Sequence, residues 1–453
     1  LDWYGPYTGG PQTDPVGYTR GDFRVTRGGS HSTTLEYLRS ANRAGTLPED
    51  RSWLIGFRVV MGEMPQAKPL PVPPPPLAQR DVKQAVPPDL AKGPDPDKPY
   101  FKGPRQYVKI PPGSDGPLFS RHNHDPAIAE CPNGDLLAIW YTCRTEPGRE
   151  LGLAASRLRY GAEQWEPASP FWDAPDRNDH APAMWFDGVD TIYHFVGLSA
   201  AATWGNTALV MRTSKDSGAT WSPARLIAPE HGMRHQPVET VFRLREGFIL
   251  LPCDAVAGGA GGTAIHLSRD GRTWTDPGEG KPQPEFAAGK TGAWIAGIHA
   301  GVVQLQDGRL MAFGRGNNID GRMPVSFSAD QGKTWTYSAS PWPPIGGGQR
   351  LVLTRLKEGP IFFASFGRNM TMTDAAGNRR KVSGLFGAVS FDEGKTWPIR
   401  KPITAGGPPH TVDGGGNTRK FTMSWESAEP RGYMSVCQTA DGVIQLISSK
   451  QHY

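Results

Sequence analysis

One short motif recurs along the sequence and limits what the chain can fold into. It consists of a serine, an aspartate, a glycine and a final tryptophan. The aspartates of its four copies are Asp216, Asp270, Asp330 and Asp392, and a fifth, degenerate copy ends at Trp165. Serine and aspartate bond backbone amides, glycine accepts a positive φ, and tryptophan packs beneath a hairpin, so each copy predicts a turn. Recurrence roughly every 60 residues indicates one supersecondary unit per repeat.

A second repeat alternates with the first. It consists of a strand, a turn containing glycine, and a second strand rich in apolar residues. Its six copies begin at His124, His180, His235, His299, Arg350 and Tyr433. This alternation predicts an all-β fold, a six-bladed β-propeller with four-stranded blades. The last blade is short of strands, and we expect residues 101–110 to supply one and close the ring.

Composition divides the chain into three zones. Residues 1–62 form a small, irregular, mixed segment, residues 63–99 a proline-rich linker, and residues 100–453 the propeller. The linker favours extended polyproline II, which predicts a semi-rigid spacer. With 56 Gly and 44 Pro an all-helical protein is disfavoured, while 14 Trp and 18 Phe can supply a large core.

Charge and apolar patterning restrict the partners. The net charge of +5 is mild and dispersed, so no nucleic-acid partner is predicted. No run of 18 apolar residues occurs, so no membrane insertion is predicted. The four cysteines lack metal-ligand spacing and the density of a disulfide framework. The chain starts at Leu1, which leaves its location open, with secretion or a periplasmic location favoured.

Four of the six hairpins start with histidine, at His124, His180, His235 and His299. The first strand of a blade lines the central channel, so these residues should converge at one mouth together with Arg350 and Tyr433. Such a ring suits general acid–base catalysis. The alternatives are channel histidines that only bond loop carbonyls, and a zinc site, for which no HxH or HExxH pattern exists. No metal is predicted. Carboxylates that could orient the histidines are Asp125, Asp179 and Glu239.

Three arginines close hairpins in a similar way. Arg144 ends the first hairpin, Arg315 the fourth and Arg368 the fifth. At like positions they predict an anion clamp, because guanidinium groups bind carboxylates in a fork geometry. The alternative is that each pairs with a carboxylate of a neighbouring blade.

The turn motifs and hairpins resemble the Asp-boxes and the six-bladed propeller of the sialidase superfamily, over about residues 101–453. In that family three arginines hold the substrate carboxylate, a tyrosine activated by a glutamate is the nucleophile, and an aspartate is the acid/base. The resemblance implies Tyr433, in GYMSVCQTADGVIQLIS, as the nucleophile and Arg315, in GVVQLQDGRLMAFGR, as a clamp arginine. Asp-boxes specify the fold, whereas activity depends on the site.

Several positions depart from the family pattern. His124 stands where the family has its first clamp arginine, with Arg121 three residues earlier, and His299 stands at the place of the glutamate. The loop for the acid/base aspartate offers Glu146 and Glu150 instead. Candidates for the third clamp arginine are Arg350, Arg368, Arg379 and Arg380. A neutral imidazole can still take a phenol proton, so His299 and Tyr433 are predicted as a general-base pair. The departures predict a substrate unlike that of an ordinary sialidase.

Residues 1–60 resemble the C-terminal portion of formylglycine-generating-enzyme-like domains, through LDWYGPY, DPVGYTRGDFRVTRGGSHS, LRSANRAG and IGFRVV. The match covers only the last part of such a domain. The chain has no cysteine between residues 1 and 130, so oxidation of a sulfatase cysteine is not expected. The resemblance implies sulfated or anionic glycans as the wider context.

Three functions are compatible with these features. The first is a sialidase-superfamily glycoside hydrolase that releases a terminal, acidic sugar, with Glu146 or a ring histidine as the acid. The second is a polysaccharide lyase, which needs the neutraliser, base and acid that arginine, histidine and tyrosine can supply. The third is a propeller that binds glycans without turnover. In each case the partner is a glycan or polysaccharide, and no cofactor is predicted.

Overall fold

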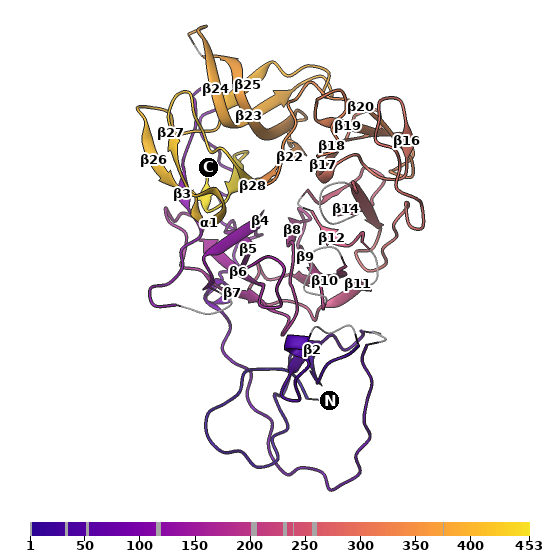
Figure 1. Cartoon of the computed structure of the whole chain (residues 1–453). Helices are drawn as coiled ribbons and strands as arrows, with labels where there is room; N and C mark the ends of the chain where they lie inside the picture. The colour runs from indigo at the N-terminus through magenta and orange to yellow at the C-terminus, as the bar shows by residue number, and fades with distance from the viewer. Residues whose placement is uncertain are drawn as a thin grey trace.

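The computed structural model describes the chain except for residues 1, 32–34, 51–53, 115–118, 201–205, 230–232, 239, 256–260 and 375. The propeller zone forms six β-sheets arranged around a central channel, as predicted from the repeats (Figure 1). The fold is nearly all β, and none of the described helices has the length and apolarity needed to cross a membrane.

The first two blades are regular antiparallel sheets. Blade 1 contains β4 (His122–Glu130), β5 (Leu136–Cys143), β6 (Gly152–Leu158) and β7 (Ser169–Trp172). Blade 2 contains β8 (Ala183–Phe186), β9 (Ile192–Leu198), β10 (Ala208–Ser214) and β11 (Arg225–Ala228). In each blade the chain runs outward from the channel, so the N-terminal strand is innermost.

The next two blades vary this plan. Blade 3 has an inner strand in two pieces, β12 (Gln236–Pro237) and β13 (Phe242–Arg243), both paired with β14 (Ile249–Asp254), which pairs with β15 (Thr263–Ser268). Blade 4 contains β17 (Ile298–Gln304), β18 (Leu310–Arg315), β19 (Pro324–Ser328) and β20 (Trp335–Ala339), with β16 (Thr291–Gly292) at its edge. The split inner strand shows that one hairpin departs from the common register.

Blade 5 contains β22 (Val352–Arg355), β23 (Ile361–Thr373), β24 (Arg379–Ser390) and β25 (Ile399–Pro402). Blade 6 contains β28 (Gly432–Gln438), β29 (Ile444–Ser448) and β30 (Gln451–His452), with β21 (Gln349–Arg350) added parallel to β28. Between these blades lie β26 (His410–Asp413), α1 (Gly415–Thr418) and β27 (Lys420–Met423). The outer strand of blade 6 is β3 (Arg105–Gln106), which pairs with β30. The predicted closure of the ring by residues 101–110 is therefore confirmed.

The repeated motif forms the turn between the third and fourth strands of a blade. In blade 4 the Ser328 hydroxyl donates to Asp330 at 2.8 Å, and the same carboxylate oxygen accepts the Thr334 N–H at 2.9 Å. Gly332 has a φ of +86°, and a Cβ there would lie 2.1 Å from Ile265. Glycine is therefore required both for backbone conformation and for space.

The N-terminal segment docks against the outer edge of blades 1 and 2. Its β1 (Arg24–Arg27) and β2 (Arg43–Thr46) form a two-stranded sheet, accompanied by a 3-10 turn at Leu35–Tyr37. The ring of Phe23 lies 5.0 Å from that of Trp172 between centroids, so the segment shares an apolar cluster with the propeller.

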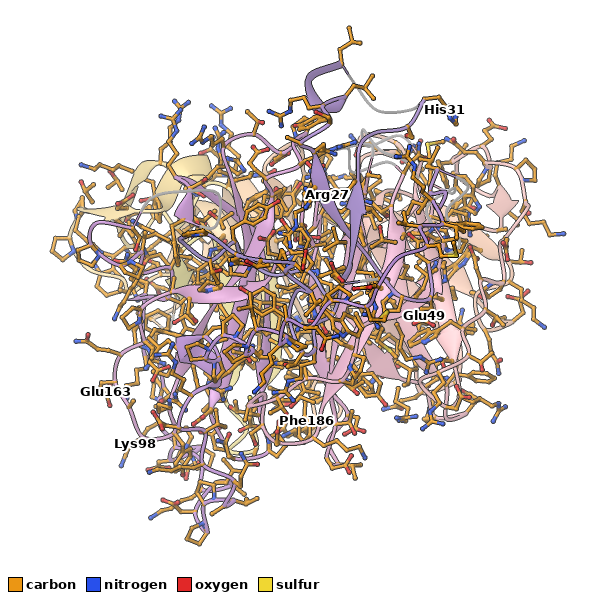
Figure 2. The ribbon with its side chains drawn as sticks, turned by 90° about the horizontal axis from the view of Figure 1, so that it is seen from below. Arg27, His31, Glu49, Lys98, Glu163 and Phe186 are labelled. Atoms are coloured by element: carbon orange, nitrogen blue, oxygen red, sulfur yellow. The ribbon has the colours of Figure 1, made fainter. Side chains whose placement is uncertain are left out.

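The segment also lies toward one face of the propeller. Figure 2 places Arg27 and His31 at the opposite side of the ring from Phe186 and Glu163. Phe186 ends β8 beside a hairpin turn, so the part of the N-terminal segment around Arg27 and His31 lies toward the face away from the hairpin turns.

Part of the proline-rich zone packs against blade 1 instead of spanning open space. Ala78, in a 3-10 turn at Leu77–Gln79, is buried, and its N–H donates to Ser169 at 3.1 Å. The Arg157 guanidinium is fully buried and donates to the Ala78 carbonyl at 2.8 Å and to Asp135 at 3.0 Å. One buried cation thus joins the linker to the first blade.

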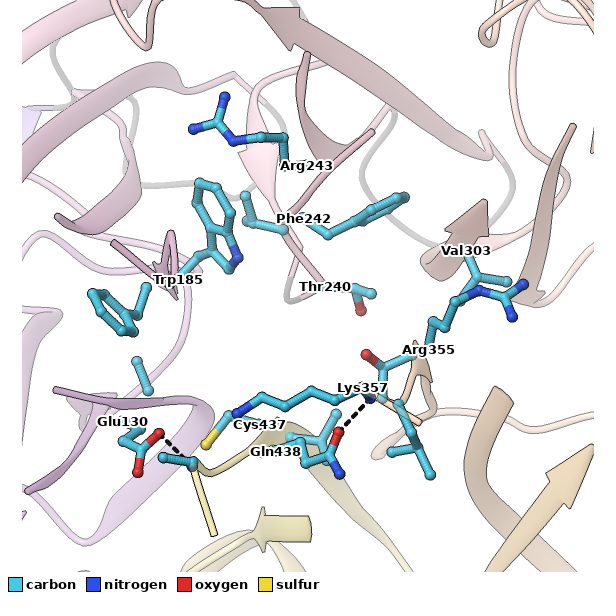
Figure 3. A pocket seen from close by; sticks show the side chains of 18 of the residues that line it. Glu130, Trp185, Thr240, Phe242, Arg243, Val303, Arg355, Lys357, Cys437 and Gln438 are labelled. Atoms are coloured by element: carbon cyan, nitrogen blue, oxygen red, sulfur yellow. Dashed lines mark hydrogen bonds between the residues drawn. The ribbon is translucent and has the colours of Figure 1, made fainter. Parts of the chain in front are cut away.

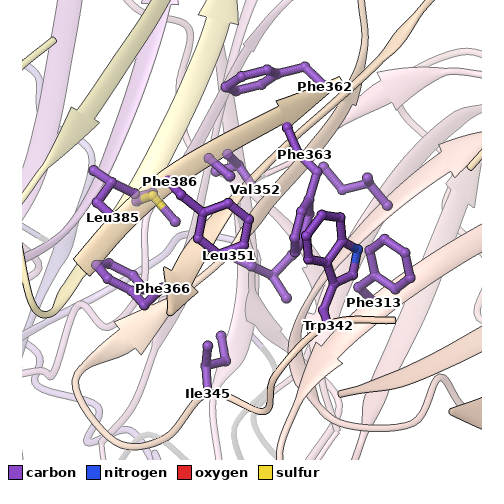
Figure 4. Close-up of a cluster of buried hydrophobic side chains, with 14 of the residues drawn as sticks. Phe313, Trp342, Ile345, Leu351, Val352, Phe362, Phe363, Phe366, Leu385 and Phe386 are labelled. Carbon is purple, nitrogen blue, oxygen red and sulfur yellow. The ribbon is translucent and has the colours of Figure 1, made fainter. Parts of the chain in front are cut away.

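The largest apolar cluster lies between blades 4 and 5 and extends into blade 6 (Figure 4). Trp342 is 1% exposed, and its ring lies 4.8 Å from Phe363 and 5.3 Å from both Phe386 and Trp397 between centroids. These contacts fill the wedge that separates two neighbouring sheets, which keeps the blades at a fixed angle.

Truncation of this wedge should destabilise the protein strongly. Trp342→Ala leaves a cavity in a packed core, and we expect a loss of about 3–5 kcal/mol in the free energy of unfolding. Denaturant unfolding measures this loss. Trp425→Ala is the matched control, because Trp425 is 59% exposed and its removal should cost far less. Equal losses for the two variants would contradict this account of the core.

Candidate active site

Four blades present one side chain at the same register of the inner strand. In these blades, positions on the second strand of the hairpin can be counted from the turn glycine. The residue five positions after that glycine pairs with a residue of the preceding strand, which is Ala127 in blade 1, Gly301 in blade 4, Val352 in blade 5 and Ser435 in blade 6. Two residues before these partners stand Asp125, His299, Arg350 and Tyr433. Residues at one register of the inner strands enter the channel at one level, which brings these four together from different blades.

The four leading histidines, in contrast, do not share a register. His124 pairs with Tyr141, whereas in blade 3 the equivalent pairing to Asp254 is made by Gln236, one residue after His235. In blade 4 that place belongs to Ile298, one residue before His299. The leading histidines therefore do not occupy equivalent register positions, although His124 and His299 both contact Tyr433.

A β-bulge turns His299 into the channel. The pairing register shifts between Ile298 and Gly301, and His299 has a φ of +51°. Blade 1 repeats the feature, with a register shift after His124 and a φ of +53° at Asp125. A non-glycine residue in this region is strained and persists only where its surroundings hold it. Here the Asp254 carboxylate accepts the His299 backbone N–H at 2.7 Å.

Asp254, His299 and Tyr433 form a chain of polar contacts across the channel. His299 Nδ1 lies 2.8 Å from Asp254 Oδ2, and His299 Nε2 lies 3.0 Å from the Tyr433 hydroxyl. A proton on Nδ1 is donated to the carboxylate, which leaves Nε2 as the acceptor for the tyrosine O–H. The arrangement can therefore take a proton from Tyr433 and stabilise the imidazolium that results.

Burial sets the protonation states of this chain. It lowers the pKa of His299 to about 4, with Asp254 acting in the opposite direction. Burial likewise raises the pKa of Tyr433 to about 12, although the Arg315 guanidinium acts to lower it. Burial of Asp254 is outweighed by its contacts with His299, which hold the pKa of that carboxyl below its usual value. At neutral pH the chain is carboxylate, neutral imidazole and phenol.

Two arginines flank the tyrosine but differ in their surroundings. Arg315 donates to the Tyr433 hydroxyl at 2.8 Å and to the Gln349 carbonyl at 3.0 Å, and it is half-buried. Arg350 is buried, forms an ion pair with Asp125, and donates to the Pro126 carbonyl at 2.6 Å. Arg315 is thus the more accessible of the two, whereas the Arg350 guanidinium joins β21 to blade 1.

The opposite wall of the site is a group of aromatic rings and a carboxylate. The His124 ring lies 3.9 Å from that of Tyr433 between centroids, and Tyr141 lies 5.0 Å from His180. Glu146 accepts a hydrogen bond from the Tyr141 hydroxyl at 2.8 Å and lies 3.2 Å from His122 Nε2. The structure therefore brings two predicted histidines and Glu146 together with Tyr433.

The charges on this wall are also set by the surroundings. Hydrogen bonding from His122 lowers the pKa of Glu146 to about 2, so this carboxylate is ionised at neutral pH. Burial lowers the pKa of His180 to about 4 and that of His124 well below its usual value. In the free protein both histidines are therefore neutral at neutral pH.

Other predicted residues lie elsewhere. The His235 ring contacts the Thr207 carbonyl at 3.0 Å and lies 5.7 Å from His266. Arg380 pairs with Asp374 near the tip of the long blade 5 hairpin, where Arg379 is also exposed. The predicted arginines Arg121, Arg144 and Arg368 have exposed side chains and remain candidates for contact with a ligand. Among the proposed orienting carboxylates, Asp179 accepts the Ala174 N–H at 2.7 Å, and Glu239 lies outside the described residues.

The arginines that close the hairpins are not at like positions either. Arg315 stands seven residues after its turn glycine, and the same place is held by Tyr141 in blade 1 and Asp254 in blade 3. Arg144 follows the end of β5, and Arg368 lies further along β23. The sequence analysis did not single out Asp254 or Tyr141. Both are found when positions in a hairpin are counted from its turn glycine instead of from its leading residue.

A cavity of about 900 Å³ opens among the ends of the inner strands, on the side of the hairpin turns (Figure 3). Trp185, Phe242, Arg243 and Lys357 are among its lining residues, and no predicted site residue is. Its wall is largely apolar, and Lys357 Nζ donates to the Thr439 carbonyl at 3.0 Å. Within the described residues no group of three or more histidine, cysteine or acidic side chains is arranged to hold a metal ion.

Comparison with known proteins supports the architecture. The sequence profile of the BNR repeat-like domain family matches residues 134–446. Comparison with curated proteins finds no significant sequence match. The NanB sialidase from Streptococcus pneumoniae superposes with a TM-score of 0.50 at 11% identity, covering 77% of this chain and 68% of that protein. An α-L-arabinanase from Penicillium chrysogenum gives a TM-score of 0.47 at 14% identity, covering 77% and 96%. The NanB similarity shows a shared fold.

The role of Asp254 can be tested through the His299 tautomer. In Asp254→Asn the amide can donate toward Nδ1, so we expect the ring proton to move to Nε2 and the Tyr433 hydroxyl to lose its acceptor. The nitrogen chemical shifts of His299 report this change. Asp190→Asn, at an exposed ion pair with Lys215, is the control and should leave the tautomer unchanged. An Nδ1–H tautomer that persists in Asp254→Asn would overturn the assignment.

Proposed function

The chain belongs to the BNR repeat-like domain family, and from this premise we propose that it is a glycoside hydrolase that releases a terminal, acidic sugar. The observation that carries the proposal is the Tyr433 hydroxyl held between His299 and Arg315, with Asp254 behind the histidine. A buried tyrosine with a general base in contact meets the requirements of an activated nucleophile.

In the proposed first step Tyr433 Oη attacks the anomeric carbon while its proton passes to His299 Nε2. Asp254 stabilises the imidazolium, as a buried carboxylate does in other nucleophile–histidine–aspartate arrangements. The bond from the anomeric carbon to the leaving oxygen breaks, and that oxygen takes a proton from an acid. Water then attacks the glycosyl–tyrosine intermediate, Oη leaves and recovers its proton from His299, and the acid is reprotonated by the water.

We assign the acid to His124. The pKa of Glu146 is about 2, so this carboxyl is ionised at neutral pH and is a poor proton donor. Its contacts with Tyr141 and His122 therefore suit a positioning role. His124 packs against Tyr433, and a bound anionic group raises the pKa of a nearby imidazole. An acidic substrate would thereby charge the histidine that the reaction uses.

Arg315 supports the choice of an acidic sugar. Its guanidinium reaches the Tyr433 hydroxyl and is half-buried, where a fork of N–H donors binds carboxylate or sulfate strongly. The exposed Arg121, Arg144 and Arg368 are further candidate contacts for an anionic chain. Arg350 is assigned a structural role through its ion pair with Asp125.

A polysaccharide lyase is the second candidate, and one observation favours it. Asp254, the carboxylate that contacts His299, and the wall carboxylate Glu146 both have lowered pKa values, so neither offers a carboxylic acid. In a uronate elimination Arg315 would neutralise the carboxylate, His299 would remove the proton beside it, and Tyr433 would protonate the leaving oxygen. The product would carry a new double bond and no added water.

The nucleophile is tested with Tyr433→Phe, which removes only the hydroxyl. We expect turnover to fall by at least about 100-fold, the scale on which such groups contribute. Product mass spectrometry on sialylated, sulfated and uronate glycans measures turnover and separates hydrolysis, which adds one water, from elimination. Tyr100→Phe, an exposed tyrosine, is the matched control. Full activity of Tyr433→Phe, or no turnover by the parent protein on any glycan, counts against the hydrolase.

The pH dependence of the reaction tests the base. His299 must be neutral to accept the proton, and its pKa is lowered to about 4. We therefore expect protonation of His299 to lower kcat/KM only through about pH 4, whereas protonation of His124, the acid, raises kcat/KM as the pH falls from neutral toward that value, because kcat/KM reports groups of the free enzyme. A decline centred near 6.5, the ordinary histidine value, would contradict a buried neutral base.

A further inference from the structure

A cleft of about 400 Å³ lies between the N-terminal segment and the first blade. We propose that this cleft binds the sugar units next to the one that is cleaved, and that these units belong to an anionic glycan. The inference rests on the proposed function and deepens it, because it assigns the N-terminal segment a part in substrate selection. The cleft is lined by Tyr4, Tyr7, Tyr37, Arg39, Ala41, Asn42, Arg43, Arg149, Glu150 and Asp176.

The N-terminal wall presents aromatic rings and guanidinium groups. The Arg43 guanidinium lies 4.0 Å from the ring centroid of Tyr4 and 4.6 Å from that of Tyr7, and it donates to the Gly5 carbonyl at 2.7 Å. Tyr7 is 73% exposed, and Arg39 is exposed beside it in the cleft. Exposed tyrosine rings give flat apolar surfaces for sugar rings, and guanidinium groups bind carboxylate or sulfate.

The propeller wall is held rigidly. Arg149 has a side chain that is 9% exposed, pairs with Asp176 at 3.1 Å, and donates to the Ala200 carbonyl at 2.8 Å. Its guanidinium also lies 4.3 Å from the ring centroid of Tyr37 in the N-terminal segment. The same arginine thus fixes both walls, so the cleft is formed before any ligand arrives.

One loop links the cleft to the candidate active site. Glu146 contacts Tyr141 and His122 in the site, and Glu150 lines the cleft four residues later, a span of at most about 14 Å. The Asn178 amide donates to the Glu146 and Gly148 carbonyls at 2.6 and 2.7 Å, which holds the loop in place. An oligosaccharide seated at Tyr433 can therefore extend along this loop into the cleft.

Charge favours an anionic chain. The Asp176 carboxylate is already paired with Arg149, which leaves Arg39 and Arg43 against the single carboxylate of Glu150. The Arg39 and Arg43 guanidinium groups come from the N-terminal segment, so the propeller alone would lack this preference. The inference predicts selectivity for chain length as well as for charge.

The experiment measures binding separately from turnover. Heparin-derived and polygalacturonate-derived oligosaccharides are titrated by calorimetry into the full chain carrying Tyr433→Phe, so that no reaction consumes the probe. We expect the added double substitution Tyr7→Ala, Arg39→Ala to weaken binding of at least one anionic probe by about tenfold, equivalent to about 1.4 kcal/mol. A neutral dextran-derived oligosaccharide should not bind.

The matched control is Tyr100→Ala, Arg272→Ala, which removes an exposed tyrosine and an exposed arginine outside both sites and should leave affinity unchanged. Unchanged affinity in the cleft variant, an equal loss in the control, or no binding of either anionic probe would overturn the inference. Turnover of these glycans by the unsubstituted chain is followed in parallel. Binding that depends on the cleft without any turnover would defeat the hydrolase proposal and leave the cleft assignment standing.

Discussion

The pairing of β3 with β30 is the constraint on which the rest of the molecule depends. Arg105 and Gln106 complete the outer edge of a sheet in which β28, β29 and β30 come from the end of the chain. A propeller is stable when each blade packs between two neighbours, so an unclosed ring would expose the apolar faces of blades 1 and 6. The same closure sets Tyr433 of blade 6 beside His124 of blade 1.

The candidate active site exists only because the ring is closed at a fixed diameter. Its principal residues come from blades 3, 4 and 6, and each contributes one member of the chain Asp254, His299 and Tyr433. Rigid strands hold these side chains within hydrogen-bonding distance, which is what catalytic groups require. The ion pair between Arg350 and Asp125 stabilises the same level of the channel and leaves Arg315 accessible to a ligand.

The segment before the propeller has more contact with it than its composition suggests. Proline-rich chains are usually spacers, yet Ala78 is buried and receives a hydrogen bond from fully buried Arg157. Further toward the N-terminus, Phe23 packs on Trp172 at the blade 1 edge. The prolines keep the chain extended, and this lets it follow the surface of the ring and deliver the tyrosine-lined cleft beside the Glu146 loop.

The sequence by itself determined the number of blades, the turn motifs and the closing strand, because these depend on local chemistry repeated at a fixed interval. It also singled out Tyr433, His299 and Arg315, which the structure brings into contact. Only the tertiary structure decided which partners they have. Blades 1 and 4 share a bulge that places His299 at the level of Asp125, one residue after His124, and the leading histidines alone do not reveal this offset. Asp254 meets His299 because blades 3 and 4 pack side by side, and a contact between distant parts of the chain depends on that packing.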